Sequence, residues 1–171
     1  MRSSIAAAAL VVANVVSGYW YEHIRHNGIS PFIEDGEHWR VHRNVKTHFG
    51  AKGDGIADDT EAIQAALNYG NGTHFRNSSA WGTTGAPALV YIPPGTYRIT
   101  KKINSYVDTV VMGDPDNLPV LQADESFTDK FFWNGHDANY DSTINFYIGL
   151  KNVVLDSTKV PQERNITLLD W

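Results

Sequence analysis

Acidic residues that stand close together in the sequence are the first candidates for chemistry. The pairs are Asp58 with Asp59, Asp114 with Asp116, and Asp124 with Glu125. Two carboxyl groups about 6.5 to 9.5 Å apart, one protonated and one activating water, can hydrolyse a glycosidic bond with inversion. The first pair precedes a helical pattern and the others lie in turns, so helix capping and solvation explain them better. We therefore predict no catalytic residue in this sequence.

Metal and nucleotide sites are also poorly supported. His23 and His26 are three residues apart, and His38 and His42 four apart, but no helical pattern places their rings on one face. No Asp-x-Asp pair occurs on an expected strand, where clustered aspartates could bind calcium. The loop glycines Gly50, Gly53 and Gly55 lack the Lys-Ser/Thr of a phosphate-binding loop. We predict no metal site and no cofactor.

Tryptophans are candidates for stacking on sugar rings. They are Trp20, Trp39, Trp81, Trp133 and Trp171. Large aromatic side chains more often fill cores and cover the ends of coils, so this alternative is preferred for each of them. The sequence therefore assigns no substrate-binding residue.

The composition indicates one acidic, β-rich domain. The chain has 171 residues, with 14 Lys and Arg against 19 Asp and Glu, a net charge of −5 that argues against nucleic acid as a partner. Charged residues make up 19% and aromatic residues 12%, which together with frequent Gly favours turn-rich β structure over a helical bundle. Cysteine is absent, which excludes disulfides, thiolate zinc sites and cysteine nucleophiles.

Residues 1–18 are predicted to be a secretory signal peptide. Arg2 precedes an apolar run from Ile5 to Val16, which is too short to span a bilayer about 30 Å thick. We therefore expect a secreted, extracellular protein with no membrane association once the signal is removed. A buried N-terminal helix or an inaccurate start is the alternative. N-glycosylation sequons support secretion and lie at Asn71, Asn77 and Asn165.

The elements expected after residue 18 begin with an extended arm over residues 19–44, rich in aromatic residues and histidine. One helix is expected from Asp58 or Asp59, either of which can cap it, to Gly70. Glu61 would complete a capping box with Asp58, and an apolar stripe follows. Residues 71–87 are polar and read as an exposed loop.

Short apolar runs follow this loop at intervals of about ten residues. Expected strands cover residues 88–92, 96–100, 109–112, 120–123, 130–133, 145–150, 152–155 and 165–169. The spacing alone fits a β-sandwich, a β-barrel or a parallel β-helix. No Asn-Gly or Asp-Gly turn joins two adjacent runs, which favours coils over hairpins.

The most specific string runs from residue 45 to residue 66 and includes Phe49, Gly50, Gly53, Asp54, Gly55, Asp58, Asp59 and Thr60. It resembles the N-terminal cap of pectate-lyase-like proteins. The resemblance implies an all-β fold, a right-handed parallel β-helix with one N-terminal capping helix. Residues 45–171 would then hold the cap and the first coils of an incomplete β-helix domain. We expect these cap residues to be architectural.

Two further strings narrow the resemblance. The segments around Tyr19 to Phe32 and Pro87 to Tyr97 resemble the start of the fungal family-55 glycoside hydrolases, the exo-β-1,3-glucanases, and Asn145 to Asp156 continues the match. The resemblance implies inverting release of glucose from β-1,3-glucan. It also implies a general acid, a glutamate, in a second domain beyond this chain, so we expect an N-terminal piece that is inactive alone and monomeric when complete.

Three alternatives stay open. The chain could be a non-catalytic β-helical module for carbohydrate binding or adhesion. It could belong to a pectin-active enzyme of the same superfamily. It could also come from a gene model that lost downstream exons.

Overall fold

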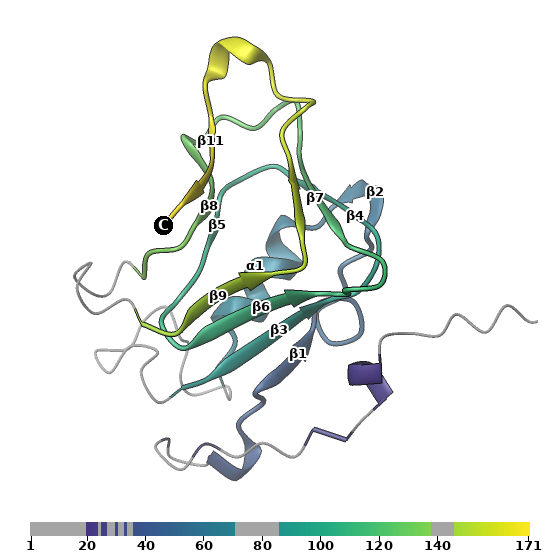
Figure 1. Ribbon diagram of the computed structural model, residues 1–171, viewed down its shortest axis with the longest axis vertical. Coiled ribbons are helices and arrows are strands. Elements are labelled where there is room, and N and C mark those ends of the chain that lie inside the picture. Colours follow the sequence, from purple (N-terminus) through teal and green to yellow (C-terminus); the bar gives the residue numbers. More distant parts are fainter. Residues whose placement is uncertain are drawn as a thin grey trace, which may run out of the picture.

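The computed structural model describes residues 20–23, 25–26, 30, 33, 36–70, 86–137 and 146–171. Short 3-10 helices lie at η1 (Trp20–His23), η2 (Gly36–His38) and η4 (Gln162–Arg164), and α1 spans Thr60–Asn68. The strands are β1 (His42–Asn44), β2 (Asp54–Asp58), β3 (Ala88–Ile92), β4 (Thr96–Ile99), β5 (Ile103–Asn104), β6 (Thr109–Gly113), β7 (Val120–Ala123), β8 (Phe131–Asn134), β9 (Ile148–Lys151), β10 (Val154–Asp156) and β11 (Thr167–Asp170). Figure 1 shows their arrangement.

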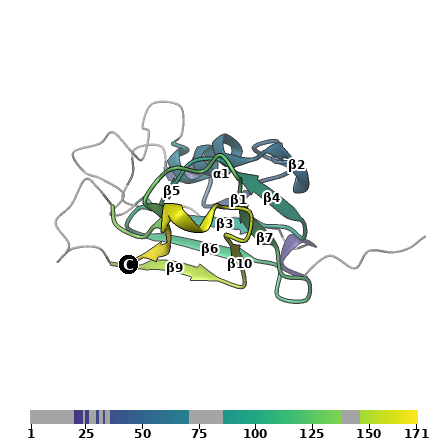
Figure 2. The same cartoon turned by 90° about the horizontal axis from the view of Figure 1, so that it is seen from above.

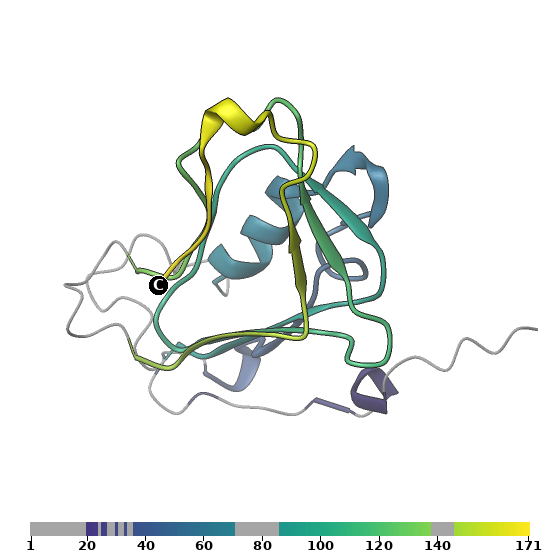
Figure 3. The same cartoon turned by 45° about the horizontal axis from the view of Figure 1, so that its top comes forward.

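Successive strands are distributed over three parallel sheets. Sheet A has the order β1-β3-β6-β9, sheet B the order β2-β4-β7-β10, and sheet C the order β5-β8-β11. The chain passes each sheet in turn and then starts the next coil, which gives the triangular outline seen in Figure 3. Each strand therefore pairs with the equivalent strand of a neighbouring coil. The expected parallel β-helix is confirmed.

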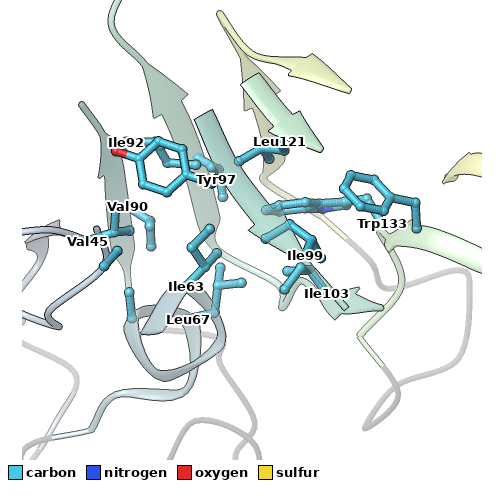
Figure 4. Packing of buried hydrophobic residues seen from close by; sticks show 14 of the residues in the cluster. Val45, Ile63, Leu67, Val90, Ile92, Tyr97, Ile99, Ile103, Leu121 and Trp133 are labelled. Atoms are coloured by element: carbon cyan, nitrogen blue, oxygen red, sulfur yellow. The ribbon is translucent and has the colours of Figure 1, made fainter. Parts of the chain in front are cut away.

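The interior is filled by stacked apolar side chains from equivalent positions of successive coils. In β4 and β7 burial alternates along the strand, as expected where one face of a sheet meets the core. Parallel register places Tyr97 beside Leu121 and Ile99 beside Ala123, all of them fully buried. Figure 4 shows these side chains converging with those of α1, including Ile63 and Leu67.

Helix α1 lies at one end of the stack, while β9, β10 and the C-terminus lie at the other (Figure 2). In chain order it occupies the place that a sheet C strand takes in each later coil. The Gln64 side chain pairs with the edge of β5: its Nε2 donates to Asn104 O at 3.1 Å, and its Oε1 accepts from Asn104 N at 2.9 Å. The helix thus satisfies backbone groups that would otherwise form an open sheet edge.

The turn before α1 is held by Asp59. Its carboxylate accepts the backbone N–H groups of Lys52 at 2.6 Å and Gly53 at 2.9 Å. Gly53 has φ of 62°, and the next coil packs against it so closely that a Cβ atom on Gly95 would lie 2.5 Å from the Gly53 carbonyl oxygen. Gly95 is therefore required by close backbone approach, and Gly53 by its positive φ.

Asp58 lies beside Asp59 and accepts from Thr60 instead. Its Oδ1 receives the Thr60 N–H at 3.0 Å and the Thr60 hydroxyl at 2.6 Å. Asp59 occupies the N-cap position without a side-chain cap bond, and Glu61 is then the second helical residue. The expected capping box between Asp58 and Glu61 is therefore wrong, because the helix begins one residue later than that box requires.

Three strands were absent from the sequence-based expectation. β1 lies within the segment expected to be an arm, β2 lies inside the cap string, and β5 is two residues long. Their residues are mostly polar, so they lack the apolar alternation used to find the others. The helix also ends at Asn68, with Tyr69 as its C-cap, before the expected Gly70.

Candidate functional site

Four of the paired acidic residues, Asp58, Asp59, Asp114 and Asp124, serve as hydrogen-bond acceptors within the fold. Asp124 accepts from Arg98 Nε at 2.6 Å and from the backbone and hydroxyl of Ser126. Asp114 is buried and accepts the Tyr91 hydroxyl at 3.0 Å. Both carboxylates are committed to local structure, as Asp58 and Asp59 are.

Hydrogen bonding also fixes the charge state of several of these acids. The hydrogen bond from Arg98 holds the pKa of Asp124 well below its usual range, and the bond from Gln122 lowers the pKa of Asp156. For Asp58, bonds from Thr100 and Thr60 outweigh the opposing effect of burial and lower its pKa. A general acid needs a raised pKa, so these ionised carboxylates are unsuited to that role.

The tryptophan candidates divide between core and surface. Trp39 and Trp133 are 3% and 0% exposed, and their Nε1 groups donate to Pro87 O and Ser105 Oγ, both at 2.8 Å. Trp133 fills the interior and cannot stack on a sugar, and Trp39 exposes too little of its ring to do so. Trp171 is 58% exposed, whereas the side chains of Trp20 and Trp81 lie outside the described residues. Phe146 and Tyr147, which we had not singled out for sugar contact, are also exposed.

A pocket of about 540 Å³ opens beside the first strand of sheet A. Its walls come from η1 and the residues after it, from residues 39–42, and from the turn after β1. In β1 both Arg43 and Asn44 are buried, and Arg43 Nη1 donates to Ala66 O at the end of α1 at 2.7 Å. The lining residues are Glu22, His26, Trp39, Arg40, Val41, His42, Asn44, Thr47 and His48.

Aromatic packing joins the N-terminal segment to this strand. The His26 and His42 rings stack with centroids 3.8 Å apart and an interplanar angle of 8°. Tyr21 contacts both rings, with centroids 4.5 Å from His26 and 5.4 Å from His42. Tyr91 in β3 lies 6.3 Å from His42. The segment around η1 is thereby seated against sheet A.

Hydrogen bonds orient the polar groups at the pocket. Asn44 donates from Nδ2 to Glu22 Oε1 at 3.1 Å, and the Asn44 backbone N–H donates to His48 Nδ1 at 3.0 Å. His26 Nε2 lies 2.9 Å from the Tyr21 carbonyl oxygen, to which it can only donate. These contacts link η1 to the turn after β1.

Burial controls the charge of two of the histidines. Burial and the positive charges that His26, His48 and Arg40 can carry lower the pKa of His42 from 6.5 to about 4. Burial and Arg40 also lower the pKa of His48. His42 is therefore neutral at neutral and mildly acidic pH.

We predict that the chain loses stability as pH falls from about 6.5 to about 4. In this window the unfolded chain binds a proton at His42 and the folded chain does not, so unfolding becomes more favourable as pH falls. The effect is at most about 3 kcal/mol of unfolding free energy. Urea unfolding at pH 7 and pH 4.5 measures it.

His42→Gln should flatten this pH dependence, since glutamine does not titrate. The matched control is His136→Gln, at a side chain that is 40% exposed and outside the pocket. Glu22, His26, His48 and Arg40 face His42 and stay unchanged in both variants. An equal pH slope in wild type and His42→Gln would contradict the prediction.

The His38 and His42 pair noted in the sequence falls on two different elements, and the side chain of His23 lies outside the described residues. His38 is exposed in η2, whereas His42 lies in β1 and lines the pocket. Across the part of the chain that the structure describes, no three His, Asp or Glu side chains are grouped to hold a metal ion.

The sequence from β1 onward matches a known protein family. The sequence profile of a family described as rhamnogalacturonase A/epimerase, pectate lyase-like, matches residues 42–171, from the first residue of β1 onward. The chain belongs to this family. The match includes the coils and α1, whereas Glu22, His26, Trp39 and Arg40 of the pocket precede it.

Two fungal proteins that are similar in sequence to this chain carry glucanase names. A probable glucan endo-1,3-beta-glucosidase of Arthroderma benhamiae is 40% identical over 86% of this chain and 17% of its own length. A glucan 1,3-beta-glucosidase of Cochliobolus carbonum is 35% identical over 96% of this chain and 21% of its own length. The chain thus spans about a fifth of these relatives, and the resemblance found in the sequence is confirmed.

A solved structure shares the fold. ORF18 of Geobacillus virus E2 superimposes with a TM-score of 0.56 and 26% identity, over 75% of this chain and 23% of that chain. A similar architecture therefore also occurs in a viral protein.

The predicted glycosylation sites fall in different parts of the chain. Asn71 and Asn77 lie outside the described residues. Asn165 follows η4 with φ of 46°, and its side chain is exposed. No helix in the described part has the length and apolar character needed to cross a membrane.

Proposed function

We propose that this chain is the N-terminal β-helical part of a secreted glycoside hydrolase acting on β-1,3-glucan. The observation that carries the proposal is the identity of 40% and 35% to two fungal glucanases over nearly the whole chain. The described carboxylates Asp58, Asp124 and Asp156, ionised and bonded within the fold, support a general acid located outside this chain.

The proposed reaction is exo-acting and inverting, releasing glucose from the non-reducing end. One relative is named as an endo-glucosidase and the other carries no such prefix, so the action pattern needs its own test. Laminarin digestion with product analysis separates the two, because exo action yields glucose from the start whereas endo action yields oligosaccharides. NMR of the first product distinguishes inversion, which gives α-glucose, from retention.

The test compares this chain alone with the longer product encoded by the genomic sequence past Trp171. We expect glucose release from laminarin by the longer product and none by the chain alone. Turnover by the chain alone would overturn the placement of the acid. If the longer product bound glucan but released no glucose, a non-catalytic binding or adhesion module would be favoured. Activity of the longer product on galacturonan would favour a pectin-active enzyme.

Secretion is part of the same proposal. The apolar run in residues 1–18 and the exposed Asn165 support it. Expression in a fungal host should give a secreted protein that lacks the first residues and loses mass on enzymatic deglycosylation. Retention inside the cell with the N-terminus intact would contradict it.

A further inference from the structure

The pocket beside β1 is separate from the ionised carboxylates on sheet B. Its walls are built by η1, residues 39–42 and the turn after β1. By contrast, Asp124 directly follows β7 and Asp156 is the last residue of β10, and both strands belong to sheet B. The stacked rings of His26 and His42 fix one wall and the Asn44 bonds to Glu22 and His48 fix the others. Such a largely formed, polar-lined concavity of about 540 Å³ is in the size range of small-molecule sites.

The hydrogen bonds determine which groups are left for a ligand. His48 Nδ1 accepts from Asn44, so in the neutral ring the proton lies on Nε2, a donor with no partner among the described residues. His26 Nε2 donates to Tyr21 O, so its Nδ1 is an acceptor when the ring is neutral. Buried His42 Nε2 has no hydrogen-bond partner among the described residues, and an unpaired buried polar atom is costly.

The pocket lining contains one acidic side chain and one arginine, whose charges are opposite. Glu22 contributes one carboxylate and Arg40 one guanidinium, while burial keeps His42 and His48 neutral at neutral pH through their lowered pKa values. The Glu22 carboxylate would repel a polyanion, and the Arg40 guanidinium would repel a cation. Donors and acceptors alternating around a neutral volume suit a ligand whose hydroxyl groups both donate and accept.

We propose that this pocket binds a neutral saccharide, a short stretch of the polymer that the longer protein acts on. That the sugar is β-1,3-linked glucose rests on the proposed function. The polymer would be held by the segment around η1 and by β1, so the module would keep the chain on its substrate between catalytic events.

Binding is measured on the whole 171-residue chain, by NMR of the imidazole nitrogens, with laminaritriose as the probe and trigalacturonate as the anionic comparison. We expect laminaritriose to shift the His42 and His48 resonances and to leave His136, outside the pocket, unchanged. Trigalacturonate should leave all three unchanged. Shifts by trigalacturonate alone, or no shift at His42 and His48 at millimolar laminaritriose, would overturn the proposal.

Two variants and a matched control test the residues. Glu22→Gln and Arg40→Met should each weaken laminaritriose binding about three- to tenfold, the loss typical of one hydrogen-bonding group. Glu61→Gln and Lys101→Met remove one acid and one base from an exposed pair 4.0 Å apart and should leave binding unchanged. Equal effects in both sets would overturn the proposal. Laminarin hydrolysis by the longer product with no binding at the pocket would refute this site and leave the proposed function standing.

Discussion

Replacing Trp133 with alanine should lower the free energy of unfolding by about 4 kcal/mol. The side chain is fully buried in β8, between Ile103 of the preceding coil and Leu169 of the following one in parallel register. Truncation removes its apolar contacts, leaves a cavity in a packed interior, and deprives Ser105 Oγ of the indole donor. Urea unfolding followed by circular dichroism measures the change.

Trp133→Phe separates packing from the hydrogen bond. Phenylalanine keeps most of the buried area and loses the bond to Ser105, so we expect a cost of about 1 to 2 kcal/mol. If the alanine and phenylalanine variants were equally destabilised, the indole N–H and not the packed volume would account for the effect.

Asp59→Ala should destabilise the chain by about 3 kcal/mol. The carboxylate is 1% exposed and accepts two backbone N–H groups, those of Lys52 and Gly53. Its removal leaves both donors unpaired beside the first turn of α1, and each unpaired donor costs about 1 to 3 kcal/mol where water is excluded. Chemical denaturation of the variant gives the value.

Asp59→Ser distinguishes this clamp from ordinary helix capping. Serine is a good N-cap residue, so it would restore stability if Asp59 acted by capping α1. Its hydroxyl is too short to replace two carboxylate oxygens reaching back to Lys52 and Gly53, so we expect Asp59→Ser to resemble Asp59→Ala. A serine variant as stable as wild type would show that the turn is not held by this side chain.

The strands found from the sequence are those whose side chains enter the core. Residues 88–92 and 120–123 were expected as strands and form β3 and β7, because they are short, mostly apolar runs that bury side chains in the core. β1 has the sequence His-Arg-Asn, and its pairing is set by β3 of the next coil. Backbone pairing between coils tolerates such polar residues, so a pattern of hydrophobicity cannot find them.

The pocket could not be predicted for a related reason. Its residues come from segments up to 26 positions apart, Glu22 to His48, and meet because aromatic rings seat η1 on sheet A. Each residue alone is an ordinary polar side chain. The density of histidine and aromatic residues before residue 44 was the available signal, and it indicated only a packed arm. The role of Asp58 was closer to expectation, because it accepts locally from Thr60 at the helix start, whereas Asp59 reaches back to Lys52 and Gly53.

The pairing of Gln64 with Asn104 limits how copies of this module can associate. With α1 occupying the flank of sheet C beside β5, another molecule cannot extend that sheet by adding a strand on the β5 side. A solenoid bare at both ends has no such barrier and can polymerise into fibres.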